Sequence, residues 1–568
     1  MENKEIISSL KLLTKLMELH EENPFKVKSV QNAVFNLDKF ATPFNSLTQK
    51  EIENLPGVGK GIAAKIIELV QNNHLTELDD LINITPSGII EILGIKGLGP
   101  KKVATIWQDL NIETVGELYY ACNENRLIEA KGFGLKTQEE IKKKIEFMMA
   151  GTGWFHYASI EPIAYSILKS LETELIQHKK IATVIEIAGD FRRNCEVLDR
   201  LIYLINTNDV NRVYDFLTVF TIGFSELNID ENRFTFRDES GIIITLQPVQ
   251  RANFPFTLFT ETGSKAHVEE VLKLLPDSTK KIFETEEQVY LDAGLTYILP
   301  ELRENTFEIE AAKNHKLPQL LNNSDLLGTL HNHSIYSDGA NTLSEMANAC
   351  IQNGLQYFGI CDHSKSAFYA KGMKEDLILA QHAEIEKLNL KLAPFKLFKG
   401  IESDILNDGS LDYSNEILST FDFVVASVHS NLKMDEQKAN ARLKKAIENP
   451  FTTILGHPTG RLLLVREGYK IDHAYIIDCC ASNNVIIELN ANPLRLDMDW
   501  RWINYAINKG VKISINPDAH KTSTLSDMRY GVLVARKAGL TAEMCFNTLN
   551  VNEMDIYFSI RKRTMEIK

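Results

Sequence analysis

Histidine and carboxylate residues recur at the ends of short apolar runs between residues 327 and 520. Nine of them could bind a metal ion through imidazole or carboxylate: His331, His333, Asp338, His363, Glu402, His429, His457, Asp518 and His520. His331/His333 and Asp518/His520 are pairs separated by one residue. Alternate residues leaving a strand point the same way, so both members of each pair can reach one cluster. The sequence therefore predicts a metal site built from these nine residues.

The donor types indicate which metals would bind and how many. Neutral imidazole together with carboxylate suits Zn, Mn or Fe, and not Ca alone. Nine ligands are too many for one ion, so we expect two or three divalent metals. Clustered metals of this kind can activate water and hold both oxygens of a phosphoester displacement. A single histidine after a strand is more often a capped or core residue, but six histidines at successive strand ends favour the metal site.

Seven short apolar runs would have to position these residues. The runs begin near residues 327, 357, 397, 423, 453, 485 and 512, with helix-length segments between most of them. This pattern predicts parallel strands joined by crossover helices. In such a barrel the carboxyl ends of the strands share one face. We therefore predict an α/β barrel of seven strands. The run near Val485 ends in Glu488 and Asn490, which look less like ligands.

Three glycine-rich motifs in residues 1–150 indicate a second site. Each reads apolar-x-Gly-apolar-Gly before a predicted helix, and the helix offers free N–H groups to a phosphate. One such motif is usually just a turn, but three in one helical segment favour binding to a DNA backbone. The predicted DNA-binding residues are Gly57, Gly59, Lys60, Gly97, Gly99, Lys101, Gly132 and Gly134.

Composition and charge limit the partners. The chain has 568 residues and a net charge of −14, and residues 1–150 hold 18 Lys and Arg against 21 Asp and Glu. DNA binding must therefore be local and use backbone amides. The seven cysteines are scattered, the first five residues do not have the form of a signal peptide, and the sequence has no apolar run of about 18 residues. We expect a cytoplasmic monomer with reduced thiols and no membrane partner.

The barrel region, 325–568, closely resembles the PHP phosphoesterase domain. The motifs that carry the resemblance are His331-Asn332-His333, Ser337-Asp338-Gly339, Asp362-His363-Ser364, Gly400-Ile401-Glu402, Ser427-Val428-His429-Ser430, Gly456-His457-Pro458-Thr459-Gly460-Arg461 and Pro517-Asp518-Ala519-His520. The resemblance implies a distorted (β/α)7 barrel with a trinuclear metal centre that cleaves phosphoesters. Arg461 would add a positive contact to the substrate as a catalytic residue.

The remaining segments resemble bacterial family X DNA polymerases. The glycine motifs look like helix-hairpin-helix motifs, and Gly189-Asp190-Phe191-Arg192-Arg193 and Thr262-Gly263-Ser264 look like that family's nucleotide motifs. The resemblance implies a multi-domain chain: an all-α helix-hairpin-helix region, an α+β nucleotidyltransferase-like palm and the barrel. The expected domains are a lyase-like helical domain at 1–80, further hairpins at 81–150, a degenerate palm and thumb at 151–315, and the PHP domain at 325–568.

Two features of this resemblance bear on activity. Polymerases hold two Mg²⁺ ions on three aspartates, and here those positions fall at Arg200, Ile202 and Thr245, none of which is acidic. We therefore predict that the chain does not synthesise DNA. Lys65 matches the family's Schiff-base lysine, which removes a 5′ deoxyribose phosphate; that role requires a lowered pKa, and a solvated surface lysine is the alternative.

Together with the predicted metal site and hairpins, the resemblance to family X polymerases implies a 3′→5′ exonuclease, or an enzyme that trims 3′ ends, in base excision repair. Its partner would be gapped, nicked or 3′-ended DNA held by the hairpins. Two alternatives stay open. A phosphomonoesterase acting on a small metabolite would use the same barrel, and a non-enzymatic DNA-end scaffold would use only the hairpins.

Overall fold

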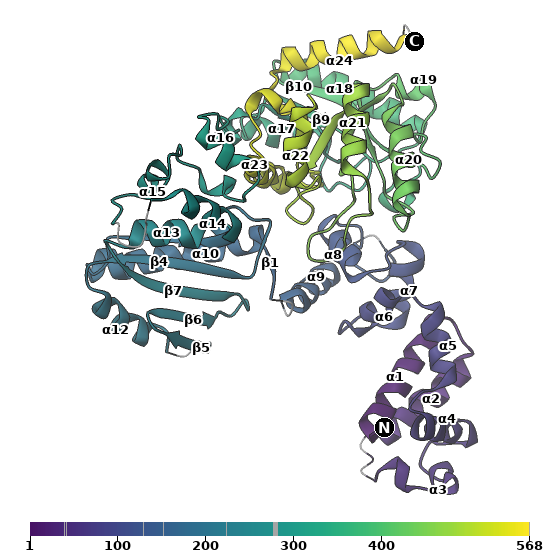
Figure 1. The fold of residues 1–568 in the computed structure, drawn as a ribbon. Helices are drawn as coiled ribbons and strands as arrows, with labels where there is room; N and C mark the ends of the chain where they lie inside the picture. Colours follow the sequence, from purple (N-terminus) through teal and green to yellow (C-terminus); the bar gives the residue numbers. More distant parts are fainter. Residues whose placement is uncertain are drawn as a thin grey trace. The chain divides into compact units, whose positions relative to one another are not determined.

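The computed structural model describes residues 1–566 except 39, 41, 129, 151–152, 223 and 277–281. The chain divides into two units, Met1–Glu146 and Phe147–Lys568, which are coloured purple to blue and blue to yellow in Figure 1. The finer division into four domains stays a prediction. Among the residues that the structure describes, no helix combines the length and apolar character needed to cross a membrane.

The first unit is all-α, as predicted. Its helices are α1 (Asn3–Leu19), α2 (Pro24–Leu37), α3 (Gln49–Glu53), α4 (Lys60–Asn72), α5 (Thr76–Ile84), α6 (Ser87–Gly94), α7 (Pro100–Ala104), α8 (Val115–Asn123) and the start of α9 (Leu135–Ala150). Ile6, Leu10 and Leu13 recur on one face of α1 and are fully buried. Asn23 accepts a hydrogen bond from Phe25 N, and proline follows it at the first position of α2. This arrangement favours a new helix at that point.

The second unit begins with an α+β region. Its five-stranded sheet has the order β2-β4-β7-β6-β5, in which β4 and β7 are parallel and the other neighbours are antiparallel. The strands are β2 (Val184–Ala188), β4 (Arg200–Thr207), β5 (Ser225–Asp230), β6 (Arg233–Arg237) and β7 (Ile243–Gln250). The helices of this region include α10 (Tyr157–Leu171), α11 (Gly189–Arg192), α12 (Val210–Phe220), α13 (Phe254–Thr262), α14 (Lys265–Leu274), α15 (Glu286–Asp292) and α16 (Glu308–Lys313). The predicted α+β class is confirmed.

The barrel follows. Its seven strands are β8 (Gly328–Thr329), β9 (Tyr357–Ile360), β10 (Lys396–Asp404), β11 (Phe423–Ser427), β12 (Thr452–Leu455), β13 (Ile486–Asn490) and β14 (Ile513–Asn516). They are parallel and lie in chain order. The helices between them include α17 (Leu343–Gln352), α18 (Glu375–Leu392), α20 (Glu436–Ile447), α21 (His473–Asn483) and α22 (Ile503–Asn508). The predicted seven-stranded α/β barrel is therefore confirmed.

The barrel is nearly closed between its first and last strands. A single parallel bridge joins Asn332 to Ala519. Below it, the side chain of Asn547 donates to Gly328 O at 3.0 Å and accepts from Ile515 N at 2.7 Å. Asn547 thus supplies, with one amide, hydrogen bonds that a neighbouring strand would otherwise make.

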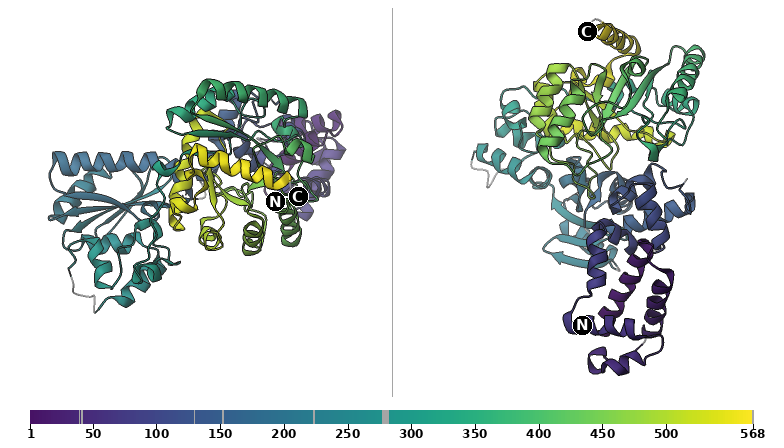
Figure 2. Two further views of the ribbon diagram at one scale, coloured as in Figure 1. Left: turned by 90° about the horizontal axis from the view of Figure 1, so that it is seen from above. Right: turned by 90° about the vertical axis from the view of Figure 1, so that its right-hand side faces the viewer.

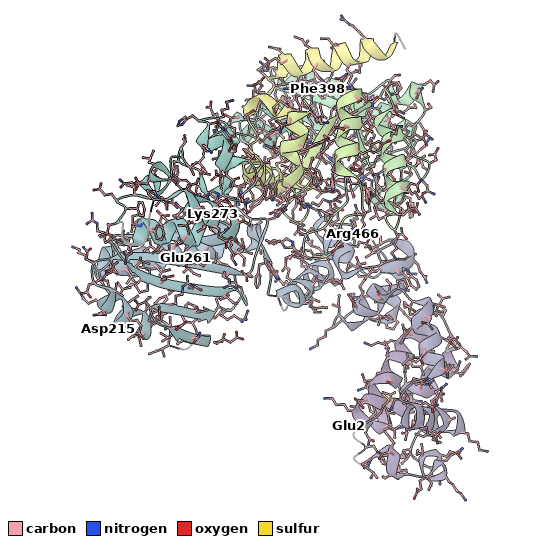
Figure 3. All side chains as sticks on the ribbon, in the orientation of Figure 1. Glu2, Asp215, Glu261, Lys273, Phe398 and Arg466 are labelled. Atoms are coloured by element: carbon pink, nitrogen blue, oxygen red, sulfur yellow. The ribbon has the colours of Figure 1, made fainter. Side chains whose placement is uncertain are left out.

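The C-terminal helix α24 (Val551–Glu566) covers the amino ends of the strands. Its Phe558 ring lies 5.1 Å from the rings of both Phe398 and Phe423. Phe398 is labelled beneath this helix in Figure 3, and Figure 2 shows the yellow helix from two further sides. The opposite, carboxyl end of the barrel is therefore the end that is left for a site.

Helix α23 (Met528–Lys537) joins the barrel to the α+β region. Arg529 donates to Glu161 at 2.8 Å, and Arg536 donates to Glu301 at 2.8 Å. Lys537 is buried and donates to Arg193 O at 2.8 Å and to Glu304 at 2.5 Å. Buried charged side chains of this kind need close partners, so this ion-pair network holds the two parts together.

Candidate metal centre

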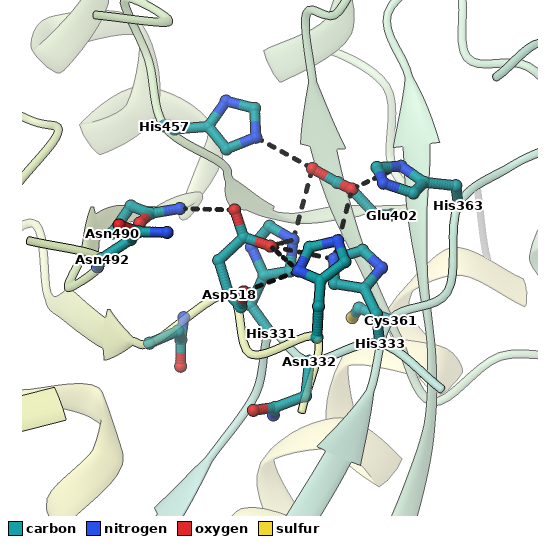
Figure 4. Close-up of polar contacts among 12 residues, drawn as sticks. His331, Asn332, His333, Cys361, His363, Glu402, His457, Asn490, Asn492 and Asp518 are labelled. Carbon is teal, nitrogen blue, oxygen red and sulfur yellow. Dashed lines mark hydrogen bonds and ion pairs between the residues drawn. The ribbon is translucent and has the colours of Figure 1, made fainter. Parts of the chain in front are cut away.

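Glu402, near the end of β10, lies at the middle of a cluster of imidazole rings. Its Oε1 lies 2.9 Å from His457 Nε2 and 3.1 Å from His429 Nε2. Oε1 is also 3.3 Å from His331 Nε2, while Oε2 is 2.8 Å from His363 Nδ1. Figure 4 shows the carboxylate between the rings of His457 and His363. Five of the nine predicted ligands thus meet at one point.

The other four predicted ligands adjoin this group. Asp518 Oδ1 lies 2.9 Å from His333 Nε2 and 3.7 Å from His331 Nε2. Asp338 Oδ1 lies 3.3 Å from His520 Nε2. The structure therefore brings all nine residues together at the carboxyl end of the barrel. The assignment of each as a metal ligand stays a prediction.

Several donor atoms of the cluster are buried and make no hydrogen bond within the described part of the chain. They include His331 Nε2, His333 Nδ1, both ring nitrogens of His363, and Glu402 Oε2. Ligands about 2.1 Å from a tetrahedral ion lie roughly 3.4 Å apart, and the distances above cluster around that spacing. Buried polar atoms left without hydrogen bonds are costly unless another partner binds them. The residues therefore fit a metal centre.

Three groupings could each hold an ion. They are His333 with Asp338, His363 and His520; His331 with His333 and Asp518; and His363 with Glu402 and His429. Because His333 and His363 each belong to two groupings, the sites would share ligands. Neighbouring groupings of this kind could hold more than one ion, and the number of ions stays a prediction.

Further polar residues, which are not among the nine predicted ligands, orient the rings from behind. Glu488 lies 2.8 Å from His331 Nδ1 and also accepts from His457 N at 2.8 Å. Asp404 contacts His429 Nδ1, and Asn490 donates to Asp518 at 3.0 Å. Carboxylates that bind the second nitrogen of a ligating imidazole fix its orientation and raise its basicity. Asp404 was detectable, because it follows Glu402 by two residues on one strand.

Asp362 anchors the loop that carries His333 and Asp338. It accepts from Ser334 N at 2.8 Å and from Gln381 Nε2 at 2.7 Å. Gly339 completes the turn, since a Cβ there would lie 2.6 Å from Ser334 N. The loop has no space for another residue type at this position, so Asp338 is held toward the rings.

Backbone conformation at two residues, and the protonation state of one ring, also suit ligand roles. Asp518 has φ +52° and His457 has φ +20°, which are uncommon for residues other than glycine and concentrate at functional sites. Burial, together with the rings of His520 and His363, lowers the pKa of His333 to about 3. His333 is therefore neutral near pH 7 and has a lone pair available for a metal.

Arg461 lies in a different network. Its guanidinium donates to Asp499 at 2.8 Å and to Arg495 O at 3.0 Å, and it also contacts Leu496 O. None of these described hydrogen bonds goes to a residue of the metal cluster. The network ties together the loops after β12 and β13. A direct contact of Arg461 with substrate stays a prediction.

The three glycine motifs adopt one repeated backbone. Gly57, Gly97 and Gly132 have φ of +79°, +94° and +88°, a region that favours glycine. The second glycine of each motif then precedes a helix: Gly59 caps α4, Gly99 caps α7, and Gly134 comes before α9. A Cβ added at these second glycines would meet no atom within 4 Å. The helix N-termini are therefore open to a phosphate, and Lys60, Lys101 and Lys136 beside them are exposed.

Lys65 lies on α4 and contacts Glu77, which also forms an ion pair with Lys26 at 2.7 Å. Burial and the charge of Lys26 lower the pKa of Lys65. The direction is the one that an amine nucleophile requires. The lyase role stays a prediction.

The three positions predicted to have lost polymerase aspartates lie on neighbouring strands. β4 and β7 are paired so that Ile202 lies opposite Thr245, with Arg200 two residues earlier on the same face of β4. Arg200 forms an ion pair with Asp199 at 2.8 Å. Within the described part of the chain, the groupings of three or more metal-binding side chains lie in the barrel and include none of these residues.

The arginines of the nucleotide-like motif are held by carboxylates. Both oxygens of Glu286 accept from Arg192 at 2.9 Å. Arg193 donates to Glu304 at 2.9 Å and to Asp190 at 2.7 Å. These contacts connect α11 to α15 and, through Glu304 and Lys537, to the barrel. The two arginines therefore act as structural ion-pair partners in this chain.

Comparison with known proteins places the chain in a family. Over 581 aligned residues it is 32% identical to the DNA polymerase/3′-5′ exonuclease PolX of Bacillus subtilis, which covers 98% of this chain and 99% of that protein. The chain belongs to the PolX family. Within it, residues 1–75 match the helix-hairpin-helix domain, residues 89–146 a SAM-like helix-hairpin-helix tandem, and residues 329–492 the PHP domain.

Shorter relatives share part of this PolX-family chain. A probable phosphatase of Thermoanaerobacter sp. is 27% identical over 244 residues, which are 41% of this chain and 94% of that protein. A probable phosphatase of Caldicellulosiruptor saccharolyticus is 29% identical over 202 residues, or 34% and 78% of the two chains. Together with the PHP match, these relatives support a hydrolase.

Proposed function

We propose that the chain is a metal-dependent phosphodiesterase that removes nucleotides from the 3′ ends of DNA and does not synthesise DNA. The observation that carries the proposal is the convergence of nine imidazoles and carboxylates, seven of them buried and two half-buried, at the end of a barrel, in a chain that also has three helix-hairpin-helix motifs. The name of the Bacillus subtilis relative includes 3′-5′ exonuclease. We place the activity in the repair of gapped or nicked DNA.

The nine cluster residues would hold the metals, which would supply Lewis acidity and lower the pKa of water. The protein's own contribution is to fix the donors. Glu488 and Asp404 hold the rings of His331 and His429 through their Nδ1 atoms. The low-dielectric surroundings of these buried groups strengthen each electrostatic contact with a phosphate.

The hairpins would bind the DNA backbone, while the phosphate that reacts would lie at the metal cluster of the barrel. Open helix N-termini after Gly59, Gly99 and Gly134 present backbone N–H groups, which bind phosphates without reading bases. Because most of this affinity comes from backbone amides, the acidic composition of the chain does not prevent it. DNA binding at these helices would therefore be independent of sequence.

A phosphomonoesterase is the second candidate, since two matched relatives are named probable phosphatases. Such an enzyme would use the same cluster but would need no hairpins. The two functions differ in substrate size, and DNA and free sugar phosphates therefore distinguish them.

The test begins with removing metals by chelation and reloading the protein with Mn or Zn. Single-stranded and gapped oligonucleotides would carry a label at the 5′ end in one set and at the 3′ end in another. A 3′→5′ exonuclease gives a ladder of shortened 5′-labelled products and early release of a labelled mononucleotide from the 3′ end. Hydrolysis of sugar phosphates with no cleavage of DNA would instead establish the phosphomonoesterase.

A further inference from the structure

Three loops that leave the carboxyl end of the barrel each expose a large apolar side chain. Ile335 lies between the candidate ligands His333 and Asp338 and is 55% exposed. Phe368, on the loop that follows His363, is 71% exposed, and Leu464 follows His457 at 36%. Single exposed apolar residues are ordinary. Three exposed apolar side chains on loops around one candidate site instead indicate a substrate that has an apolar surface.

The loop Ser364–Lys374 is fixed against the cluster. Ser366 Oγ donates to Asp404 at 2.7 Å, and Asp404 in turn contacts His429. Ser366 N also donates to Asp412 at 2.7 Å, and a Cβ at Gly372 would lie only 1.9 Å from Ser364 O. The Cα of Phe368 is two residues from Ser366, so it lies within about 7.6 Å of that Cα. The exposed ring is therefore on a rigid support next to the candidate metal centre.

The same loop is basic. Residues 364–374 include Lys365, Lys371 and Lys374, all exposed, and contain no Asp or Glu. Lys365 is partly neutralised, since it lies 3.0 Å from Glu375. An aromatic ring flanked by lysines is the combination that binds single-stranded nucleic acid, with bases stacked on the ring and phosphates near the ammonium groups. A small sugar phosphate would use neither feature.

We propose that the loop Ser364–Lys374 is a subsite for unpaired nucleotides near a DNA 3′ end, with a base stacked on Phe368. The inference rests on the proposed function and adds a residue, Phe368, that would recognise the substrate. A base inside a duplex is already stacked on its neighbours, so only an unpaired one can occupy the ring. The subsite therefore favours single-stranded or frayed 3′ ends over blunt duplexes.

The test compares two single-stranded oligonucleotides that differ only near the 3′ end. One has ordinary bases throughout, and in the other the three nucleotides before the terminal one are abasic. The native protein should cleave the first with a kcat/KM about tenfold higher. Phe368→Ala should lose most of that preference, by losing rate only on the substrate with bases, and Phe368→Trp should restore it. Lys374→Gln should slow both substrates equally.

Leu390→Ala is the matched control, since Leu390 on α18 is 86% exposed and its truncation also removes an apolar surface side chain. It should leave both rates unchanged. An unaltered preference in Phe368→Ala, or an equal loss on both substrates, would overturn the subsite. A native protein that cleaves neither oligonucleotide would instead overturn the proposed nuclease function.

Discussion

The barrel and the α+β region of the second unit each contain motif residues of an enzyme family. The two regions differ in whether those polar residues are hydrogen-bonded to other side chains. In the barrel, His331 Nε2 and both ring nitrogens of His363 converge and make no hydrogen bonds among the described residues. In the α+β region, Arg192 and Arg193 are bound by Glu286 and Glu304. Convergent polar groups without mutual hydrogen bonds are available to a ligand. Polar groups that satisfy one another stabilise the fold instead.

The largest predicted effect is on the barrel. His331→Ala together with Asp518→Ala removes two donors from one grouping, and we expect metal content and DNA cleavage to fall to background together. Elemental analysis and the end-label assay measure these. Circular dichroism should show an unchanged helix content. Full activity in the folded double variant would refute the site.

The α+β region should show no activity of the polymerase kind. With Arg200, Ile202 and Thr245 at the three positions, no carboxylates are present there to hold Mg²⁺ ions. Primer extension on gapped DNA with Mg²⁺ or Mn²⁺ is the measurement, made with the His331/Asp518 double variant so that exonuclease does not remove products. Template-dependent extension above a blank would show that the catalytic strand is elsewhere.

A smaller loss of activity should follow from replacing a residue that orients a candidate ligand. Glu488→Gln keeps the size of a side chain that contacts His331 Nδ1 but removes its charge, and we expect metal affinity or activity to fall about 10- to 100-fold. Glu448→Gln, an exposed glutamate that pairs with Lys444, is the control. Equal activity of the two variants would argue that Glu488 only fills space.

The hairpins can be tested without straining them. Gly59 and Gly99 have negative φ, and a Cβ added at either would meet no atom within 4 Å. Leucine therefore fits at both positions but would obstruct a phosphate. The double variant should bind DNA about tenfold more weakly, whatever the sequence. Gly94→Leu, at the end of α6 with similar open space, should bind normally. Unchanged affinity of the Gly59/Gly99 variant would move the DNA site elsewhere.

The smallest effect concerns pH and stability. Burial opposes ionisation of Glu286, but the ion pairs with Arg303 and Arg192 lower its pKa to about 2. A depressed folded pKa stabilises the fold above the unfolded value of about 4.5, and that contribution is lost as the pH falls from there toward 2. Its full size is on the order of 3 kcal/mol. Denaturant unfolding across this range should show the loss, and Glu286→Gln should flatten it. An identical pH profile in the variant would exclude the ion pairs as its cause.

The barrel and its nine candidate ligands could be predicted for two reasons. Short apolar runs mark the strands in the sequence, and the carboxyl ends of strands in a parallel barrel lie at one face. The hairpin glycines could be predicted for a similar local reason. The partners of Arg192 and Arg193 could not, because Glu286 and Glu304 lie about a hundred residues away and nothing local pairs them. Glu488 was seen at a strand end, but only the fold shows that it contacts a ring nitrogen of His331.

The amide of Asn547 has a consequence for synthesis of the chain. It bonds to Gly328 O and Ile515 N, and so joins the first and last strands of the barrel. A ribosome makes Gly328 more than two hundred residues before Asn547, and all nine candidate ligands also precede it. Because N-terminal segments fold first as they emerge, the helices with the glycine motifs can form and meet DNA while the barrel is still unjoined. The nuclease we propose would therefore be assembled only after Asn547 has been synthesised.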